Sequence, residues 1–251
     1  MDCGRIVVMV DIVFLGLNDI GERLYEWLVA RDDANVQALI TEADQLSIVR
    51  ELEPELLIAG GFRYIVPPEI LEIPDRGSVN LHKAYLPFNR GANPNVWSIQ
   101  EDTPAGVTIH YMTEDLDSGP IIDRREVDKR PDDDAKDLYQ RLETAQFEQF
   151  VEVWPDIRDG TVDGQPQEFE SRGTYHTKED FVELWELDLE RETTVGAVID
   201  KLRALTFPPF KNAYFKVNDN RYFIDISITK AEQSKSNNER RIPKYTEDEQ
   251  P

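Results

Sequence analysis

The 251-residue chain contains one cysteine, three histidines and no apolar run long enough to cross a bilayer. Cys3 has no second cysteine with which to form an internal disulfide. The apolar stretch at residues 6–16 contains Asp11, and it is shorter than the roughly 20 residues that a membrane-spanning helix needs. It also lacks a credible cleavage site, so we interpret it as a buried first strand and not as a signal peptide. We therefore expect a cytoplasmic protein that does not associate with a membrane.

Positive charge is also scarce. The chain has 28 basic and 50 acidic residues, for a net charge of −22, and arginine outnumbers lysine 18 to 10. Such a field repels polyanions, so we expect no binding to nucleic acid. An acidic surplus with few lysines favours a salt-rich, halophilic cytoplasm, where screening makes the self-repulsion tolerable. The alternative is an ordinary acidic soluble protein.

Two kinds of catalytic site find no support in the sequence. No group of His, Cys and carboxylate residues has the spacing of metal ligands, so we expect no metal. No serine lies in a nucleophile elbow and Cys3 lies near the terminus, so covalent catalysis is not indicated. Residues 16–21 form a glycine-containing turn between a strand and a helix. They lack the full three-glycine spacing of a dinucleotide loop, and we interpret them as a tight turn.

Apolar runs that alternate with amphipathic segments predict an α/β fold. Strands are predicted at 7–15, 36–40, 56–59 and 78–81, with helices at 18–31 and 43–52. This alternation is typical of a parallel, Rossmann-like sheet. Two further strands are predicted at 107–112 and 120–127. They precede a long helix at 135–154, for which Asp132, Asp133 and Asp134 supply acidic capping.

The C-terminal part of the chain is smaller and differently built. It contains predicted helices at 178–187 and 195–205 and predicted strands at 213–217 and 222–228, joined by a turn at 218–220. After Lys230 the chain is polar, and we expect disorder. We therefore divide the protein into a catalytic domain (1–172), a small α+β appendage of helices and a β-hairpin (173–230), and a tail (231–251).

Asn80, His82 and Asp117 form the candidate catalytic group. Asn80 and His82 are two residues apart in an extended segment and lie on one face, at a strand end where the sites of α/β sheets gather. Asp117 lies in a Leu-Asp-Ser-Gly turn that we expect opposite them. The three groups suit attack of an amine on a carbonyl: the amide polarises, the imidazole moves a proton and the carboxylate holds or charges the imidazole. His110 alternates with apolar neighbours along a strand, and we interpret it as structural.

The segments that carry this group resemble the folate-dependent formyltransferases. The resemblance covers residues 54–127 and includes Asn-Leu-His (80–82), Leu-Pro-Phe-Asn-Arg-Gly (86–91), Gly-Val-Thr-Ile-His (106–110) and Leu-Asp-Ser-Gly (116–119). It implies a Rossmann-like formyltransferase core, N10-formyltetrahydrofolate as co-substrate, no metal, and catalytic roles for Asn80, His82 and Asp117. The pterin contacts that it implies, made largely through backbone groups in the first segment, come from Phe62, Arg63, Tyr64, Ile65, Glu114, Asp115 and Leu116.

Residues 82–97, 173–180 and 203–209 look most like enzymes that formylate nucleotide-linked amino sugars. The implied acceptor is a 4-amino-4,6-dideoxyhexose on a nucleoside diphosphate such as dTDP, and these relatives pair through the appendage, so we expect a homodimer. A diphosphate requires local cations. Lys178 is one candidate, and the other expected substrate contacts are Lys83, Asn89, Arg90, Tyr175 and His176. Alternatively, Arg90 holds its own loop, Tyr175 packs beneath the appendage and His176 is a turn residue.

Three other functions stay open. A methionyl-tRNA formyltransferase needs a basic C-terminal region to hold tRNA, whereas residues 177–251 carry 12 basic and 15 acidic residues. A glycinamide ribonucleotide formyltransferase does not account for the appendage. An inactive folate-binding or nucleotide-sugar-binding protein does not account for the complete catalytic group.

Overall fold

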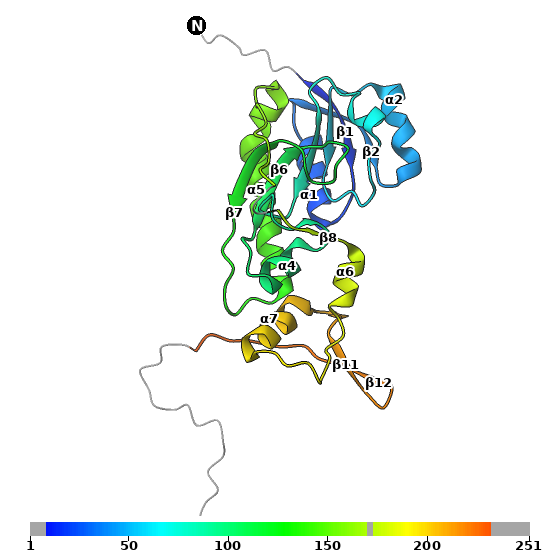
Figure 1. Ribbon diagram of the computed structural model, residues 1–251. Helices are drawn as coiled ribbons and strands as arrows, with labels where there is room; N and C mark the ends of the chain where they lie inside the picture. The colour runs from blue at the N-terminus through cyan, green and yellow to red at the C-terminus, as the bar shows by residue number, and fades with distance from the viewer. Residues whose placement is uncertain (1–8, 170–172, 232–251) are drawn as a thin grey trace, which may run out of the picture.

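The computed structural model describes residues 9–169 and 173–231, and its centre is a six-stranded sheet with the order β2-β1-β3-β4-β6-β7 (Figure 1). The first four strands in this order pair in parallel, and β6 and β7 pair antiparallel. The direction therefore changes beside β4, the strand that carries Asn80 and His82. The strands are β1 (Val10–Leu15), β2 (Ala34–Ile40), β3 (Leu56–Ala59), β4 (Ser78–His82), β6 (Gly106–Tyr111) and β7 (Ile121–Glu126).

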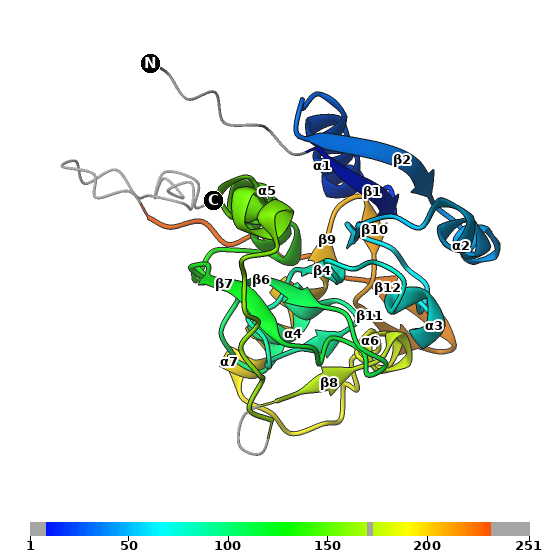
Figure 2. The same cartoon turned by 90° about the horizontal axis from the view of Figure 1, so that it is seen from above.

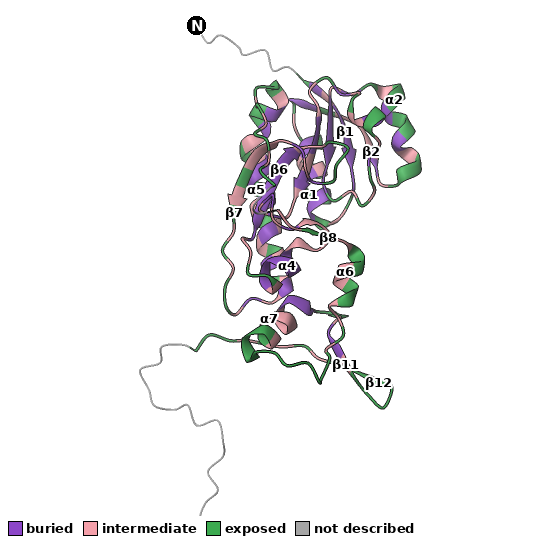
Figure 3. Cartoon of the chain, in the orientation of Figure 1, coloured by how far each residue is buried: buried purple, intermediate pink, exposed green. Residues whose placement is uncertain are grey.

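Helices cover both faces of the sheet, as the continuous apolar runs predict. Ile12 and Phe14 of β1 face one side with α1 and α5, and Val13 and Leu15 face the other with η1, α2 and α3. Figure 2 shows α1 and α3 on opposite sides of the sheet, and Figure 3 shows its central strands buried. The bounds are α1 (Asp19–Val29), η1 (Ala43–Ser47), α2 (Ile48–Leu52), α3 (Pro68–Leu71) and α5 (Ala135–Asp159).

A third apolar cluster attaches the appendage to the core. Val96 and Ile99 of α4 (Pro94–Gln100) and Leu138 and Leu142 of α5 pack with Ala204 of α7. This contact fixes the appendage beside α4 and α5. Its elements are α6 (Lys178–Glu183), α7 (Val195–Leu205), the ribbon of β9 (Thr206–Phe207) and β10 (Phe210–Lys211), and the hairpin of β11 (Tyr214–Val217) and β12 (Asn220–Phe223).

The α/β core with its small α+β appendage is confirmed; the differences are several element ends and short elements that were not predicted, among them α4. The long helix α5 continues past Trp154 through Pro155 and ends where Gly160 takes a left-handed conformation. The helix predicted over 178–187 stops at Glu183, because Trp185 and Leu187 form backbone hydrogen bonds with Tyr214.

The second strand of the appendage hairpin ends at Phe223, five residues before its predicted end. The helix predicted over 43–52 consists of the 3-10 turn η1 followed by α2. The predicted tail lies almost entirely outside the described residues. None of the described helices is both long and apolar enough to span a membrane.

Candidate active site

The antiparallel pairing of β4 with β6 builds the floor of the site. Asn80 pairs with His110, and His82 pairs with Thr108. The fully buried Thr108 hydroxyl donates to the carbonyl of Ala84 at 2.7 Å and accepts from the N–H of Leu86 at 3.2 Å. The threonine of the Gly-Val-Thr-Ile-His segment thus holds the loop that leaves His82.

Asp117 enters the site from a tightly constrained turn. Its backbone is left-handed, with φ of 52°. A side chain at Gly119 would overlap the carbonyl oxygen of Tyr111, so only glycine fits there. The Gln167 amide donates to the carbonyl oxygens of Asp117 (3.1 Å) and Gly119 (2.7 Å). Together these contacts aim the Asp117 carboxylate at β4.

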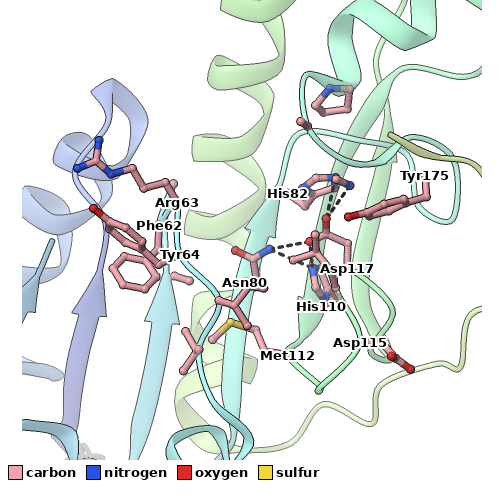
Figure 4. A pocket seen from close by; sticks show the side chains of 18 of the residues that line it. Phe62, Arg63, Tyr64, Asn80, His82, His110, Met112, Asp115, Asp117 and Tyr175 are labelled. Carbon is pink, nitrogen blue, oxygen red and sulfur yellow. Dashed lines mark hydrogen bonds and ion pairs between the residues drawn. The ribbon is translucent and has the colours of Figure 1, made fainter. Parts of the chain in front are cut away.

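Asn80, His82 and Asp117 lie together, as Figure 4 shows. Asp117 Oδ2 accepts from the Gly91 N–H at 2.9 Å and lies 3.7 Å from His82 Nε2. Asp117 Oδ1 lies 3.4 Å from Asn80 Nδ2. His82 Nε2 also lies 3.4 Å from the carbonyl oxygen of Asn89. Both neighbours of Nε2 are acceptor oxygens, which favours the tautomer with the proton on Nε2 and leaves Nδ1 as the basic nitrogen of a neutral imidazole.

His110 belongs to the same cluster, and the structural role predicted for it is incomplete. Its Nδ1 lies 2.8 Å from the carbonyl oxygen of Tyr111 and therefore donates to it. Its Nε2 then accepts from Asn80 Nδ2 at 3.1 Å and lies 3.6 Å from Asp117 Oδ1. His110 is only 2% exposed. In the sequence, the position of His110 in the Gly-Val-Thr-Ile-His segment was the only sign of a role in the site. Its place opposite Asn80 depends on the register of β4 against β6, which the neighbouring residues do not reveal.

Burial and charge set the protonation of the cluster. Burial lowers the pKa of His82, although the Asp117 carboxylate acts in the opposite direction. Burial alone would raise the pKa of Asp117, but the two imidazoles and the N–H of Gly91 hold it well below its usual range. At neutral pH the site therefore contains an ionised carboxylate beside a neutral imidazole.

These side chains line one part of a pocket of about 500 Å³. Phe62, Arg63 and Tyr64 lie across the pocket from His82 and Tyr175 (Figure 4). Glu42 accepts from Arg63 at 2.9 Å and also from the Tyr64 hydroxyl, which holds this segment in place. All residues predicted to contact a pterin line the pocket: Phe62, Arg63, Tyr64, Ile65, Glu114, Asp115 and Leu116.

Four of the predicted substrate-binding residues line the same pocket: Lys83, Tyr175, His176 and Lys178. Tyr175 is 49% exposed, so it is not packed beneath the appendage. It is brought there by β8 (Tyr175–His176), which pairs in parallel with β5 (Arg90–Gly91). His176 stacks on Trp97 with 3.8 Å between ring centroids and is more than a turn residue.

Asn89 and Arg90 do not line this pocket; they hold loops. The buried Asn89 side chain bonds to the hydroxyls of Thr103 at 2.7 Å and Thr174 at 2.9 Å. Arg90 Nη1 donates to Ser118 Oγ at 2.8 Å, and its guanidinium lies over the ring of Phe169. These contacts tie together the loop after β4, the Asp117 turn and the segment that precedes β8. In the described ranges, no group of three or more His, Cys, Asp or Glu side chains is arranged to hold a metal ion.

Residues 29–154, half of the chain, match the family described as "Formyl transferase". Residues 180–230 match a second family, described as "N-formyltransferase dimerization C-terminal domain". The first match contains the complete Asn80–His82–Asp117 cluster, and the second covers most of the appendage.

Two curated relatives align with slightly more than half of their own lengths. A dTDP-4-amino-4,6-dideoxyglucose formyltransferase of Mycobacterium tuberculosis is 39% identical over 137 residues, which is 55% of this chain and 58% of that protein. A methionyl-tRNA formyltransferase of Dictyoglomus thermophilum is 32% identical over 174 residues, which is 68% of this chain and 54% of that protein.

A solved structure extends the comparison. It is the formyltransferase PseJ of Anoxybacillus kamchatkensis, in complex with UDP-4,6-dideoxy-4-formamido-L-AltNAc and tetrahydrofolate. This protein is 35% identical to the chain, with a TM-score of 0.63 and coverage of 76% of this chain and 98% of that one. With the family match and the site geometry, this similarity shows that the chain belongs to the formyltransferase family.

Proposed function

We propose that the protein transfers the formyl group of N10-formyltetrahydrofolate to the amine of a nucleotide-linked amino sugar, a 4-amino-4,6-dideoxyhexose. The observation that carries this proposal is the position of the Asn80–His82–Asp117 cluster in one pocket, between residues 62–65 and the half-exposed Tyr175. A donor and an acceptor bound at these two ends would meet at the cluster. The named activity of the mycobacterial relative and the ligands of the Anoxybacillus complex support the same pair of substrates.

The donor end of the pocket has the chemistry of a pterin site. Phe62, Val66, Leu71 and Met112 give it an apolar wall, and Ile65, which is 74% exposed, lies at its surface. A pterin is flat and apolar on its faces and polar at its edge, so a wall of this kind beside the irregular backbone of residues 62–65 suits it. The folate would supply the activated formyl carbonyl.

His82 would transfer the proton, and Asp117 would assist it. A neutral His82 takes the proton released by the attacking amine, and the Asp117 carboxylate stabilises the imidazolium that results. The same imidazole then returns the proton to the departing folate nitrogen. Both substrates are held in place, so positioning supplies part of the rate.

Asn80 would stabilise the negative charge that develops on the formyl oxygen. One of its two amide N–H groups is engaged with His110 at 3.1 Å. The other makes only a 3.4 Å contact with Asp117, so it is available to the substrate oxygen. His110 therefore orients the group that polarises the carbonyl.

Of the lysine and arginine side chains that line the pocket, one, at the acceptor end, has no counter-charge among the described residues. Arg63 is paired with Glu42 and Lys83 with Glu143, whereas Lys178 makes no ion pair with any residue that the structure describes. Lys178 would contact the diphosphate, and Tyr175 would stack on the nucleoside base. Asn89 and Arg90 would contribute by holding the loops.

The division into a catalytic domain (1–172) and an appendage (173–230) is retained as part of the proposal, with the appendage pairing two copies of the chain. The family that residues 180–230 match is described as a dimerization domain, which supports this pairing. Three elements of the appendage each carry an apolar side chain that is more than half exposed: Val182, Phe210 and Phe223. Figure 3 shows that much of this region is exposed. Light scattering at low and high salt should give the mass of a dimer, and a monomer mass in both would contradict the pairing.

The proposed activity is tested with a substrate panel. We would offer dTDP-, GDP- and UDP-linked amino sugars with N10-formyltetrahydrofolate, in low and high KCl, and follow folate release. Release that depends on one class of amino sugar supports the proposal. Release that depends on methionyl-tRNA or glycinamide ribonucleotide instead would assign one of the other formyltransferase activities, and no release with any acceptor would indicate a binding protein.

A further inference from the structure

A stack of two aromatic side chains joins strand β8 to helix α4. The imidazole of His176 lies flat on the indole of Trp97, with 3.8 Å between the ring centroids and 8° between the ring planes. Trp97 is buried, and the His176 side chain is only 13% exposed. The proton transfer described above makes no use of this stack, although His176 lines the same pocket.

Hydrogen bonds close the stack into a ring of contacts. The indole N–H of Trp97 donates to the carbonyl oxygen of Ala92 at 3.0 Å, and the Ala92 N–H donates to the carbonyl oxygen of His176 at 2.8 Å. Glu101 Oε1 lies 3.2 Å from His176 Nε2, but the two atoms are not aligned as a hydrogen bond. The stack and the two backbone contacts, more than the carboxylate, therefore fix the place of His176.

This ring of contacts lies one residue from the hydrogen bond that holds the catalytic carboxylate. Gly91, which precedes Ala92, donates its N–H to Asp117 Oδ2 at 2.9 Å. Gly91 has φ of 87°, and a side chain there would overlap the carbonyl oxygen of His176. The two backbones thus touch directly, so the position of the Gly91 N–H depends on the position of His176.

The strands that meet here are too short to hold themselves in place. Strands β5 and β8 contain two residues each and form a separate two-stranded sheet. An isolated ribbon of this kind is marginally stable, so side chains must hold it. Asn89 and Thr174 bond to each other at one end, and the Trp97–His176 stack holds the other.

We propose that His176 is a positioning residue, whose stack on Trp97 holds both the acceptor end of the pocket and the Gly91 N–H that orients Asp117. The proposal deepens the proposed formyl transfer and rests on it for its catalytic meaning. Losing the stack should impair acceptor binding and turnover together. Losing a ligand contact such as Tyr175 should impair acceptor binding alone.

Amide hydrogen exchange in the free protein tests this link without any substrate. We expect His176→Ala to speed exchange of the Gly91 and Ala92 N–H groups about tenfold, as for loss of one stacking contact in a segment that opens locally. His176→Phe keeps a flat ring in the stack and should restore the wild-type rates. The N–H of Leu86, which bonds to a buried hydroxyl of β6, should exchange equally in all three proteins.

Kinetics with each substrate varied in turn separates positioning from ligand binding. His176→Ala should raise the KM for the nucleotide sugar and lower kcat, each about tenfold, and His176→Phe should restore both. Unchanged Gly91 exchange in a folded His176→Ala variant overturns the proposal. So does a His176→Phe variant that keeps the high KM, because that result would make the imidazole itself a ligand contact.

Tyr222→Ala is the matched control, because it also removes a stacked ring from the appendage, the one on Phe215. It should leave Gly91 exchange unchanged, and an equal acceleration would overturn the proposal. If His176→Ala does not fold, His176→Gln keeps the bulk and removes the ring. Gly91 exchange should again rise, and no change overturns the proposal. The exchange measurements use no substrate, so their failure is distinct from failure of the proposed activity, which the acceptor panel reports separately.

Discussion

The His82 side chain is 11% exposed and lies beside a carboxylate, and desolvation lowers its pKa, which keeps it neutral at physiological pH. Replacing it with asparagine removes the group that moves the proton but leaves a polar side chain of similar size. We expect His82→Asn to lower turnover by about a hundredfold or more, as for loss of a general acid–base group, with little change in melting temperature. Single-turnover kinetics and a thermal melt check both parts. A variant that keeps most of its turnover would remove His82 from the mechanism.

The Asp117 carboxylate raises the pKa of His82, so removing this carboxylate should shift that pKa in a known direction. In Asp117→Asn the imidazole loses this support and its pKa falls further. Turnover requires neutral His82, so the acid limb of the kcat–pH profile should move to lower pH. The plateau should fall at least about tenfold, because the imidazolium formed during transfer loses its partner. An acid limb that moves to higher pH would contradict the proposed roles.

Asn80 and His82 could be predicted from the sequence because their two-residue spacing fixes a shared face. Asp117 could be predicted from its turn and from the family resemblance. The contact of His110 with Asn80 depends on the register of β4 against β6, which 23 intervening residues separate in the chain. Lys83 has its partners, Tyr139 and Glu143, more than 50 residues away. A sequence shows that a lysine is present, but it does not show that its charge is already paired.

The turn at residues 116–119 determines where Asp117 points. A methyl group at position 119 overlaps the Tyr111 carbonyl, which belongs to strand β6 and cannot yield without disturbing the sheet. Gly119→Ala should therefore displace the turn, lower turnover by at least about tenfold and lower the melting temperature.

Gly196→Ala is the control for the turn variant. Position 196 lies in the first turn of α7. The methyl group of an alanine there would lie 3.9 Å from Thr194 Oγ1, which is an ordinary contact distance. This substitution should leave activity unchanged and stability equal or slightly higher, because alanine favours the helix. Equal losses in both variants would mean that the turn is not specifically constrained.

Strand β8 and the start of α6 line the part of the pocket that we propose binds the acceptor. Removing Tyr175 or Lys178 by alanine should raise the KM for the nucleotide sugar about tenfold, since each loses one stacking or charge contact. The KM for the folate should be nearly unchanged, because Phe62, Arg63 and Tyr64 of the proposed pterin site lie across the pocket from Tyr175. Steady-state kinetics with each substrate varied in turn separate the two. Variants that weaken folate binding alone would place the two substrates the other way round.

Elements with a clear apolar pattern were predictable from the sequence, whereas elements that form where distant loops meet were not. Strand β3 and helix α7 have the predicted bounds, and Asp134 caps α5 as expected from its run of acids. Helix α4 was not predicted, because its seven residues follow a left-handed Asn93 inside a loop rich in Pro, Gly and Asn. The paired strands β5 and β8 are two residues each, and they form because two distant loops meet.

The acidity of the protein sets its response to salt. With a net charge of −22, the folded chain brings many carboxylates close together, and this repulsion opposes folding. We expect the melting temperature to rise from dilute buffer to molar KCl, because screening weakens the repulsion more than it weakens the fewer ion pairs. A melting temperature that stays flat or falls as KCl is added would contradict the halophilic interpretation.

Transfer of a labelled formyl group tests the proposed function most directly. The protein would be incubated with N10-formyltetrahydrofolate carrying ¹³C in its formyl group and with the amino sugar nucleotide preferred in the panel. We expect the ¹³C signal to appear as a formamide on the sugar nitrogen, in wild-type protein and not in His82→Asn. Label that stays on the folate, or that appears only as free formate, would show that the protein does not transfer the formyl group to an amino sugar.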